Sequence, residues 1–124
     1  MNRQMQEQKK RELRQEIEAN GYGWVNGKYI KPPEEYRLRD RELSCISMID
    51  SILCYNCRGW QDAERVLKYE ETSYHNYLAD YVDLFGRDKV LELIQGQIDS
   101  IDSVSVGVFT DSEGCTYNSI NYKN

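Results

Sequence analysis

Apolar residues recur every three or four positions through the middle of this chain, which is the spacing that predicts amphipathic helices. From Leu43 to Leu53 they fall within about 160° of a helical wheel, and polar residues cover the other side. This apolar face consists of Cys45, Ile46, Met48, Ile49, Ile52 and Leu53. We therefore expect a core helix here, closed by Gly59. Upstream, Pro32-Pro33 presets a first helical turn that carries Glu34 and Glu35 near its positive end.

Three shorter helices are predicted to follow, each from apolar residues at helical spacing. The first is marked by Trp60, Ala63, Val66 and Leu67. The second is marked by Tyr74, Tyr77, Leu78, Tyr81, Val82 and Phe85, with Gly86 as its stop. The third is marked by Val90, Leu91, Ile94, Ile98 and Ile101.

The N-terminal stretch, residues 3–19, is rich in strong helix formers. Its only large apolar residues are Met5, Leu13 and Ile17. A helix that is polar nearly all round packs lightly or waits for a partner. We therefore predict that residues 1–20 form a lightly docked, charged helix and that residues 21–124 form a single α+β domain.

Two segments carry the signals of β-hairpins. Asn26-Gly27 stands between short aromatic and β-branched runs, and a tight hairpin turn favours this pair because both of its positions need φ > 0. Residues 104–108 alternate valine with smaller side chains, which is strand spacing, and residues 111–114 form the turn to a partner strand over 115–122. The chain is thus predicted to be α+β, with about five helices and one or two β-hairpins that form a small antiparallel sheet.

The composition is that of one globular domain, because 124 residues with 40% hydrophobic and 30% charged side chains can build a core. The charge is uneven along the chain. Residues 1–41 hold ten Lys or Arg and seven Asp or Glu, a balance of +3, whereas residues 42–124 hold six and fourteen, a balance of −8, in agreement with the net charge of −5. We call residues 42–124 the acidic body and residues 1–41 the basic arm. This uneven charge indicates which partners the chain can attract, but it does not indicate the fold.

The chain lacks the features of membrane and secreted proteins. No apolar run is long enough to span a bilayer, and the first four residues lack the apolar stretch of a signal peptide. We therefore expect a soluble, cytoplasmic protein without a membrane partner, whose four cysteines are free thiols.

The pair Cys54 and Cys57 has the spacing of a redox motif or of half a zinc site. A thioredoxin-like pair lies at a helix N-terminus, where the dipole stabilises the thiolate, whereas this pair lies at the end of a predicted helix. Zinc would need His75 and Cys115 as its other ligands, with no second cysteine pair to support them. A dyad of either cysteine with His75 shows no orienting partner. We predict structural thiols, no metal, no cofactor and no enzymatic activity.

Two groups of basic residues indicate nucleic-acid binding as one possible function. Arg37 and Arg41 share one helical face, and the N-terminal arm carries further lysines and arginines. Neighbouring glutamates lower the net positive charge of both groups, whereas phosphate binding favours a net basic face. A nucleic-acid-associated regulator that uses the basic arm and grips phosphate with Arg37 and Arg41 is therefore the second hypothesis.

The last third of the chain resembles a known class of small proteins in its sequence. The residues that carry it are Leu84–Val90, Phe109–Gly114 and Tyr117–Ile120. This stretch resembles small accessory proteins of phages and integrative elements of gut Firmicutes, a class that includes anti-CRISPR inhibitors. The resemblance implies a protein that binds and modulates a host enzyme, and because no functional motif is matched, it assigns no site residue.

The first hypothesis for function follows from the acidic body. A field of one sign favours a protein partner with a basic surface, which it would steer towards the complex. The acids expected to form this face are Asp80, Asp83, Asp99 and Asp102. We expect a non-enzymatic protein-binding module, in its specific form an inhibitor of a nucleic-acid-handling enzyme, and the sequence leaves the oligomeric state open.

Overall fold

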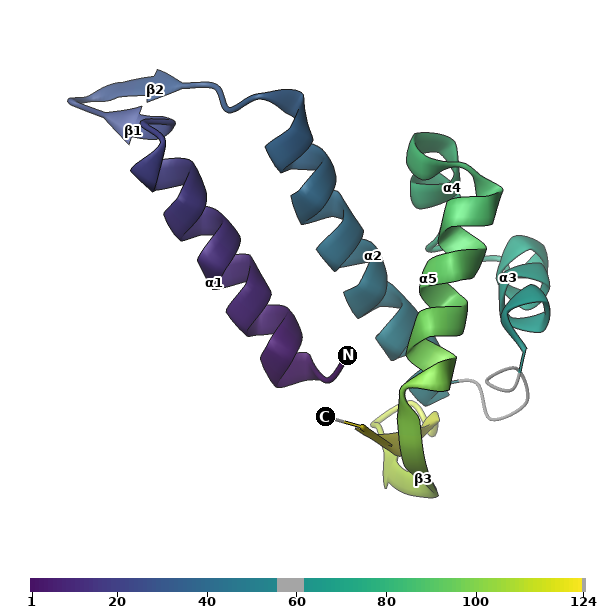
Figure 1. The fold of residues 1–124 in the computed structure, drawn as a ribbon. Coiled ribbons are helices and arrows are strands. Elements are labelled where there is room, and N and C mark those ends of the chain that lie inside the picture. Colours follow the sequence, from purple (N-terminus) through teal and green to yellow (C-terminus); the bar gives the residue numbers. More distant parts are fainter. Residues whose placement is uncertain (56–61, 124) are drawn as a thin grey trace.

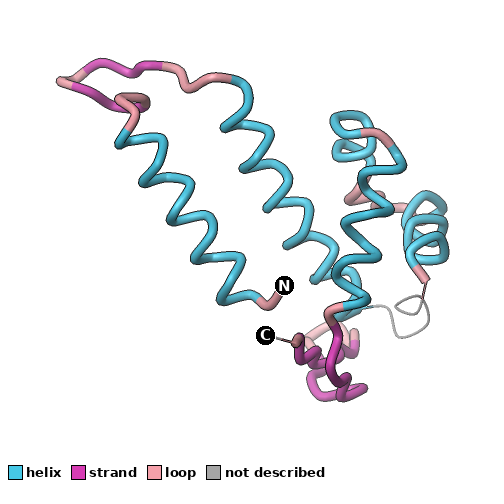
Figure 2. The backbone as a smooth tube through the Cα atoms, viewed as in Figure 1, coloured by secondary structure: helices cyan, strands magenta, loops and turns pink. Residues whose placement is uncertain are grey.

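The computed structural model describes residues 1–55 and 62–123, which form five helices and four strands. In chain order the elements are α1 (Arg3–Ala19), β1 (Gly23–Val25), β2 (Lys28–Ile30), α2 (Glu34–Tyr55), α3 (Ala63–Thr72), α4 (Ala79–Phe85), α5 (Arg87–Asp99), β3 (Ile101–Thr110) and β4 (Thr116–Tyr122). α1 packs along one side of α2 and α5 along the other, while α3 and α4 pack on α5 (Figure 1). Helices make up most of the chain, and the strands are confined to two hairpins at opposite ends of the molecule (Figure 2). The predicted α+β class is confirmed.

The central element is α2, a single helix of 22 residues. It joins the helical start predicted after Pro33 to the core helix predicted from Leu43, so the two predictions describe one element. Glu34 and Glu35 lie in its first turn, where the helix dipole favours acids. The predicted apolar face is confirmed, since its buried residues include Cys45, Ile46, Ile49, Ile52 and Leu53. Gly59, which was expected to close this helix, and Trp60, which was expected to mark the next, lie outside the described residues.

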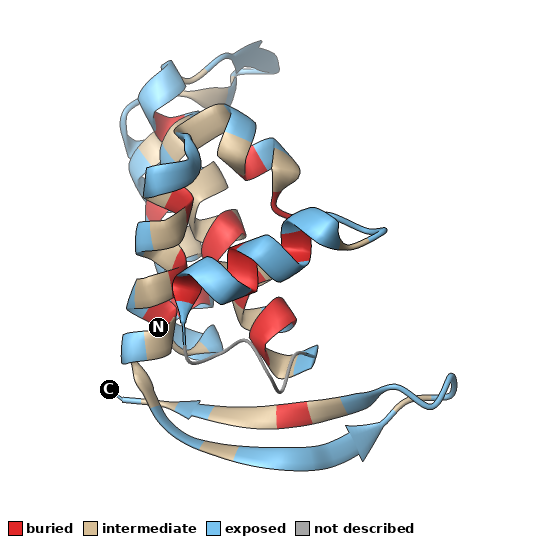
Figure 3. Ribbon diagram, turned by 90° about the vertical axis from the view of Figure 1, so that its right-hand side faces the viewer, coloured by how far each residue is buried: buried red, intermediate tan, exposed pale blue. Residues whose placement is uncertain are grey.

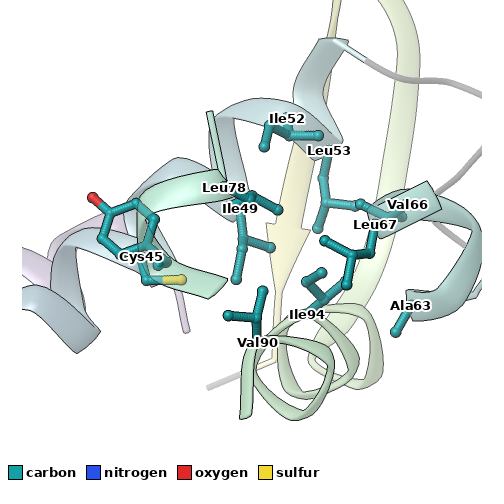
Figure 4. Close-up of a cluster of buried hydrophobic side chains, with 11 residues drawn as sticks. Cys45, Ile49, Ile52, Leu53, Ala63, Val66, Leu67, Leu78, Val90 and Ile94 are labelled. Atoms are coloured by element: carbon teal, nitrogen blue, oxygen red, sulfur yellow. The ribbon is translucent and has the colours of Figure 1, made fainter. Parts of the chain in front are cut away.

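The core forms where this face of α2 meets α3, α4 and α5 (Figure 4). The buried cluster consists of Cys45, Ile49, Ile52, Leu53, Ala63, Val66, Leu67, Leu78, Tyr81, Val90 and Ile94. Full burial of a leucine or isoleucine side chain contributes about 1.5–3 kcal/mol. Among the described residues, the cluster and the side chains packed against it include none from α1.

Two helix boundaries differ from those predicted. The helix expected from Tyr74 begins only at Ala79, because the carboxylate of Glu70 accepts a hydrogen bond from the backbone N–H of Tyr77 and holds the preceding residues in an exposed turn. The helix expected to reach Ile101 ends at Asp99, and Ile101 instead begins β3, where it pairs with Tyr122. In both places a partner outside the predicted helix overrides the local helical spacing.

The two hairpins form separate two-stranded sheets and do not join. β1 and β2 lie at the far end of α1 and α2, and their turn has Asn26 at φ 51° and Gly27 at φ 78°, as the predicted tight turn requires. β3 and β4 cross the opposite end of the helical bundle, with β4 on the inside and most of β3 exposed (Figure 3). Their pairing is interrupted between Ser105 and Phe109, where Gly107 adopts φ 69°.

The hairpin of β3 and β4 is attached to α2 and to the core. Ile120 packs against the buried cluster. The hydroxyl of Tyr122 donates a hydrogen bond to Asp50 of α2, and the hydroxyl of Tyr55 donates one to Tyr117 of β4 at 2.9 Å. These contacts fix the hairpin relative to the C-terminal end of α2.

α1 lies against α2 through one buried apolar residue and several polar contacts. Leu13 is buried, whereas Ile17 is half-buried and Met5 is exposed. Lys10 donates a hydrogen bond to Ser44 at 2.9 Å, and Ser47 donates one to the buried Gln6 at 2.7 Å. Whether this docking is light, as the division into residues 1–20 and 21–124 supposes, stays a prediction.

Candidate partner-binding groove

A groove of about 640 Å³ opens where the ends of α2 and α3 meet the tip of the β3–β4 hairpin. α2 contributes residues of its last two turns, from Met48 to Tyr55, α3 its last turn and the residues after it, and the hairpin its turn. We define the tyrosine groove by six of its lining residues: Tyr55, Tyr69, Glu70, Tyr77, Asp111 and Glu113. These residues come from three segments far apart in the sequence.

The three tyrosines supply the aromatic surface of the groove. Tyr55 is 54% exposed, Tyr69 59% and Tyr77 55%, so each ring keeps about half of its surface available to a partner. Tyr69 faces outward because Val66 and Leu67 take the core side of α3. Large aromatic side chains that remain exposed next to one another are typical of binding surfaces, where they bury much area at low entropic cost.

Glu70 is the residue that places Tyr77. Only 3% of its surface is exposed, and its carboxylate accepts a hydrogen bond from the backbone N–H of Tyr77. Burial raises the pKa of Glu70, and the N–H groups of Tyr77 and Leu78 partly offset this effect. The buried carboxylate therefore closes the turn after α3 and turns Tyr77 towards the groove rather than into a helix.

Asp111 fixes the hairpin side of the groove. One carboxylate oxygen accepts hydrogen bonds from the N–H groups of Glu113 and Cys115, both at 2.9 Å, and the other accepts one from the Tyr117 hydroxyl at 2.6 Å. These donors, with Tyr117 the most important, lower the pKa of Asp111. Tyr117 in turn accepts from Tyr55, and the two rings lie 4.3 Å apart. The chain of hydroxyls ties the hairpin tip to the end of α2.

The groove carries negative charge. Among the described residues, those that line it include Glu70, Asp111 and Glu113 but no lysine or arginine. Two helices end here, and neither the last turn of α2 nor that of α3 contains a basic residue. Within the described residues, the last turns of the two helices thus supply no cation to offset the carbonyl ends of their dipoles, which adds to the negative field of the carboxylates.

The four acids predicted to form a binding face are all exposed, but they do not form one cluster. Asp80 and Asp83 lie on α4, next to the start of α5, whereas Asp99 ends α5 and Asp102 lies in β3. The 13 residues of α5 separate the two pairs by roughly 20 Å. None of the four lines the tyrosine groove.

The predicted phosphate-binding arginines have partners within the chain. Arg37 forms an ion pair with Glu34 at 2.6 Å. Arg41 places its guanidinium over the ring of Tyr81, 5.1 Å from the centroid. Binding of phosphate through these two residues would compete with both contacts.

The residues considered for zinc are divided between two surfaces. His75 and Cys115 line the tyrosine groove, whereas Cys54 lines a neighbouring groove of about 500 Å³ between α1 and α2. Cys57 lies outside the described residues. Burial, with a smaller contribution from Asp50, raises the pKa of Cys54 to about 11. In the part of the chain that the structure describes, no group of three or more His, Cys, Asp or Glu side chains could hold a metal ion.

Sequence reasoning missed most of the groove. It placed Tyr77 among the apolar residues of a predicted helix, and it assigned no binding role to Tyr55, Tyr69 or Glu113. One signal was available: ten tyrosines against two phenylalanines indicate aromatic surface that keeps contact with water or a partner. A second was the position of Tyr69, which is out of phase with the apolar stripe of its helix.

Comparisons with family models, with curated proteins and with solved structures found no match to this chain. No helix among the described residues has both the length and the apolar character needed to cross a membrane.

Proposed function

We propose that this chain is a non-enzymatic protein-binding module whose partner presents a basic surface. The observation that carries the proposal is the tyrosine groove, which combines three half-exposed aromatic rings with carboxylates and no lining lysine or arginine among the described residues. Tyrosine is enriched among the residues that dominate binding energy at protein interfaces. The carboxylates around the rings favour a partner of positive charge.

The charge of the rest of the chain supports the same partner. Residues 42–124 carry fourteen acids and six bases. Asp80, Asp83, Asp99 and Asp102 are exposed on two parts of this acidic body, so they contribute to its long-range field rather than to one contact patch. Such charges act mainly on the rate of association.

The specific form of the proposal is an inhibitor of a nucleic-acid-handling enzyme. Such enzymes bind phosphate backbones with lysine and arginine, so their substrate channels are basic. An acidic protein that enters such a channel competes with the nucleic acid. The resemblance of the C-terminal stretch to accessory proteins of phages and integrative elements is in keeping with this role.

The alternative, a regulator that binds nucleic acid through Arg37 and Arg41, has less support from the geometry. Both side chains already contact Glu34 and Tyr81, respectively. The Arg37–Glu34 ion pair is exposed and contributes little to stability, so it could be exchanged for phosphate, whereas Arg41 stacks on a buried ring of the core. The experiment below therefore separates the two functions directly.

The test is affinity capture from a bacterial lysate at low and high salt, with and without nuclease treatment. We expect a protein that stays bound after nuclease treatment and is released by salt. Wild type should be compared with Arg37→Ala/Arg41→Ala, which should capture the same protein. Capture that requires intact nucleic acid, or that is lost in the arginine variant, would support the regulator and overturn the proposal.

A further inference from the structure

We propose that the tyrosine groove receives an arginine side chain of the partner, stacked on its tyrosine rings and paired with Glu113. This inference rests on the proposed function and names the group that the groove recognises. The groove has the volume of a ligand pocket, which is typically about 300–1,000 Å³. It therefore has room for a long side chain together with part of its backbone.

The rings are suited to a planar cation. A guanidinium group stacks on the face of a tyrosine, because the ring presents negative charge there. The described part of the chain itself uses this contact: Arg39 lies over the ring of Tyr36 at 5.6 Å and Arg41 over that of Tyr81 at 5.1 Å. Tyr55, Tyr69 and Tyr77 offer three more rings, and no arginine among the described residues lines their groove.

The three carboxylates of the groove differ in whether they are free to pair with a guanidinium group. Glu70 and Asp111 already accept hydrogen bonds from the backbone N–H groups that shape the groove. The Glu113 side chain is exposed at the hairpin tip, and within the described residues its carboxylate has no hydrogen-bond or ion-pair partner. Glu113 is therefore the acid that can pair with an incoming guanidinium, while Glu70 and Asp111 add to the field.

Arginine fits this site better than lysine. Its planar fork can stack on a ring and donate two hydrogen bonds to one carboxylate at the same time, and it is less strongly hydrated than an ammonium group. The carbonyl ends of α2 and α3 favour either cation. The preference for arginine therefore depends on the tyrosine rings, which makes it testable.

The experiment is an NMR titration of the full chain in low salt, followed through backbone amide shifts. The probe is a blocked peptide with three arginines, and the comparisons are peptides with three lysines and with three citrullines, which keep the shape of arginine without its charge. We expect shifts around Tyr77 and Glu113, weaker binding of lysine, and weakest binding of citrulline. Equal binding of the citrulline peptide, or shifts confined to the surroundings of Asp80 and Asp83, would overturn the inference.

Matched variants test the roles of the residues. Tyr77→Leu and Glu113→Gln should each weaken the arginine peptide by about threefold or more, as expected for one exposed cation–π contact or ion pair. Tyr77→Phe keeps the ring and should bind nearly as wild type. Tyr29→Leu is the control, because Tyr29 is 59% exposed and lies in β2, in the hairpin at the opposite end of the molecule.

Failure of the arginine site can be distinguished from failure of the proposed function. A captured protein that is retained by the Tyr77→Leu/Glu113→Gln variant at wild-type strength would overturn the arginine site and leave the proposed function standing. An arginine peptide that binds in the groove, with no protein captured by the whole chain, would support the site and contradict the proposed function.

Discussion

At the scale of single residues, Glu70 has the most consequences for the groove. It lies in the last turn of α3, where the helix dipole disfavours an acid, and it is almost fully buried. It is retained there by the N–H groups of Tyr77 and Leu78, of which Leu78 also donates to Asn76 Oδ1 at 3.3 Å. The position of Tyr77 therefore depends on a carboxylate seven residues before it.

Two replacements of Glu70 should separate the contribution of its charge to stability from that of its hydrogen bonds. Glu70→Ala leaves the Tyr77 N–H without its acceptor and should lower the free energy of unfolding by about 1–3 kcal/mol. Glu70→Gln keeps an acceptor oxygen and should cost less. Urea denaturation at pH 7 measures both variants. Equal losses in the two variants would show that shape rather than hydrogen bonding holds this turn.

The same residue predicts a pH dependence. Burial raises the pKa of Glu70, so the folded state keeps this proton to higher pH than the unfolded chain does. Its contribution to the free energy of unfolding is therefore greatest at low pH and falls as pH rises above the usual glutamate pKa of about 4.3. Relative to Glu70→Gln, wild type should lose stability as the pH rises above the unfolded glutamate pKa of about 4.3. Parallel stability profiles for the two proteins would contradict the raised pKa.

The cysteines should differ in reactivity. Burial raises the pKa of Cys45 to about 12 and that of Cys54 to about 11, whereas Cys115 is exposed. Alkylation requires thiolate and access, so Cys115 should be labelled by iodoacetamide at pH 8 at least about tenfold faster than the other two. Peptide mass spectrometry over a time course reports each site separately. Rapid labelling of Cys54 would place its thiol in a more open setting than the structure shows.

At the scale of elements, α1 and α2 differ in how they are held. α2 takes part in the buried cluster through four of its residues, whereas α1 contributes one buried apolar residue, Leu13, outside that cluster. The contacts between Lys10 and Ser44 and between Gln6 and Ser47 are polar. Most helical stability in proteins comes from packing an apolar face, so α1 depends on α2 far more than the reverse.

Deletion of residues 1–18 should therefore leave a folded body. The truncated chain should unfold cooperatively in urea, with a loss of about 1.5–3 kcal/mol for the burial of Leu13. Near-ultraviolet circular dichroism of the tyrosines should persist. A molten or insoluble product would show that the cover α1 gives to Ile46 and Leu43 is essential for folding. Replacement of Leu13 by alanine in the full chain provides the milder comparison.

The elements also show which features could be predicted from the sequence. The apolar face of α2 and the Asn26-Gly27 turn were predictable, because both depend on residues adjacent along the helix or the turn. The start of α4 was not, since it depends on Glu70 reaching the Tyr77 N–H across the turn. The groove was not predictable either, because Tyr55, Tyr69 and Glu113 come together only through the packing of two helix ends against a hairpin.

At the scale of the whole molecule, exposed aromatic residues lie at both ends. Trp24 and Tyr29 pair across the β1–β2 hairpin with ring centroids 5.6 Å apart, and both are exposed. The tyrosine groove lies at the opposite end, beside the β3–β4 hairpin. Residues 1–41, which include the β1–β2 hairpin, carry ten bases and seven acids, whereas residues 42–124 carry six bases and fourteen acids. Charge therefore distinguishes the two ends as contact surfaces for a basic partner.

This distribution predicts how salt and mutation act on binding once the partner is captured. The association rate should fall steeply with added salt, because charges on an exposed surface are screened beyond about 10 Å at 0.1 M ionic strength. Asp80→Asn/Asp83→Asn should slow association without unfolding the domain, because both side chains are exposed and lie outside the groove. Tyr77→Leu should instead speed dissociation, because it removes a contact made in the complex. Stopped-flow and surface-binding kinetics at several salt concentrations measure both rates.

The arginine variant decides between the two accounts of binding. If Arg37→Ala/Arg41→Ala abolishes binding while Asp80→Asn/Asp83→Asn has no effect, the acidic body does not guide the partner, and the basic face of α2 takes its place.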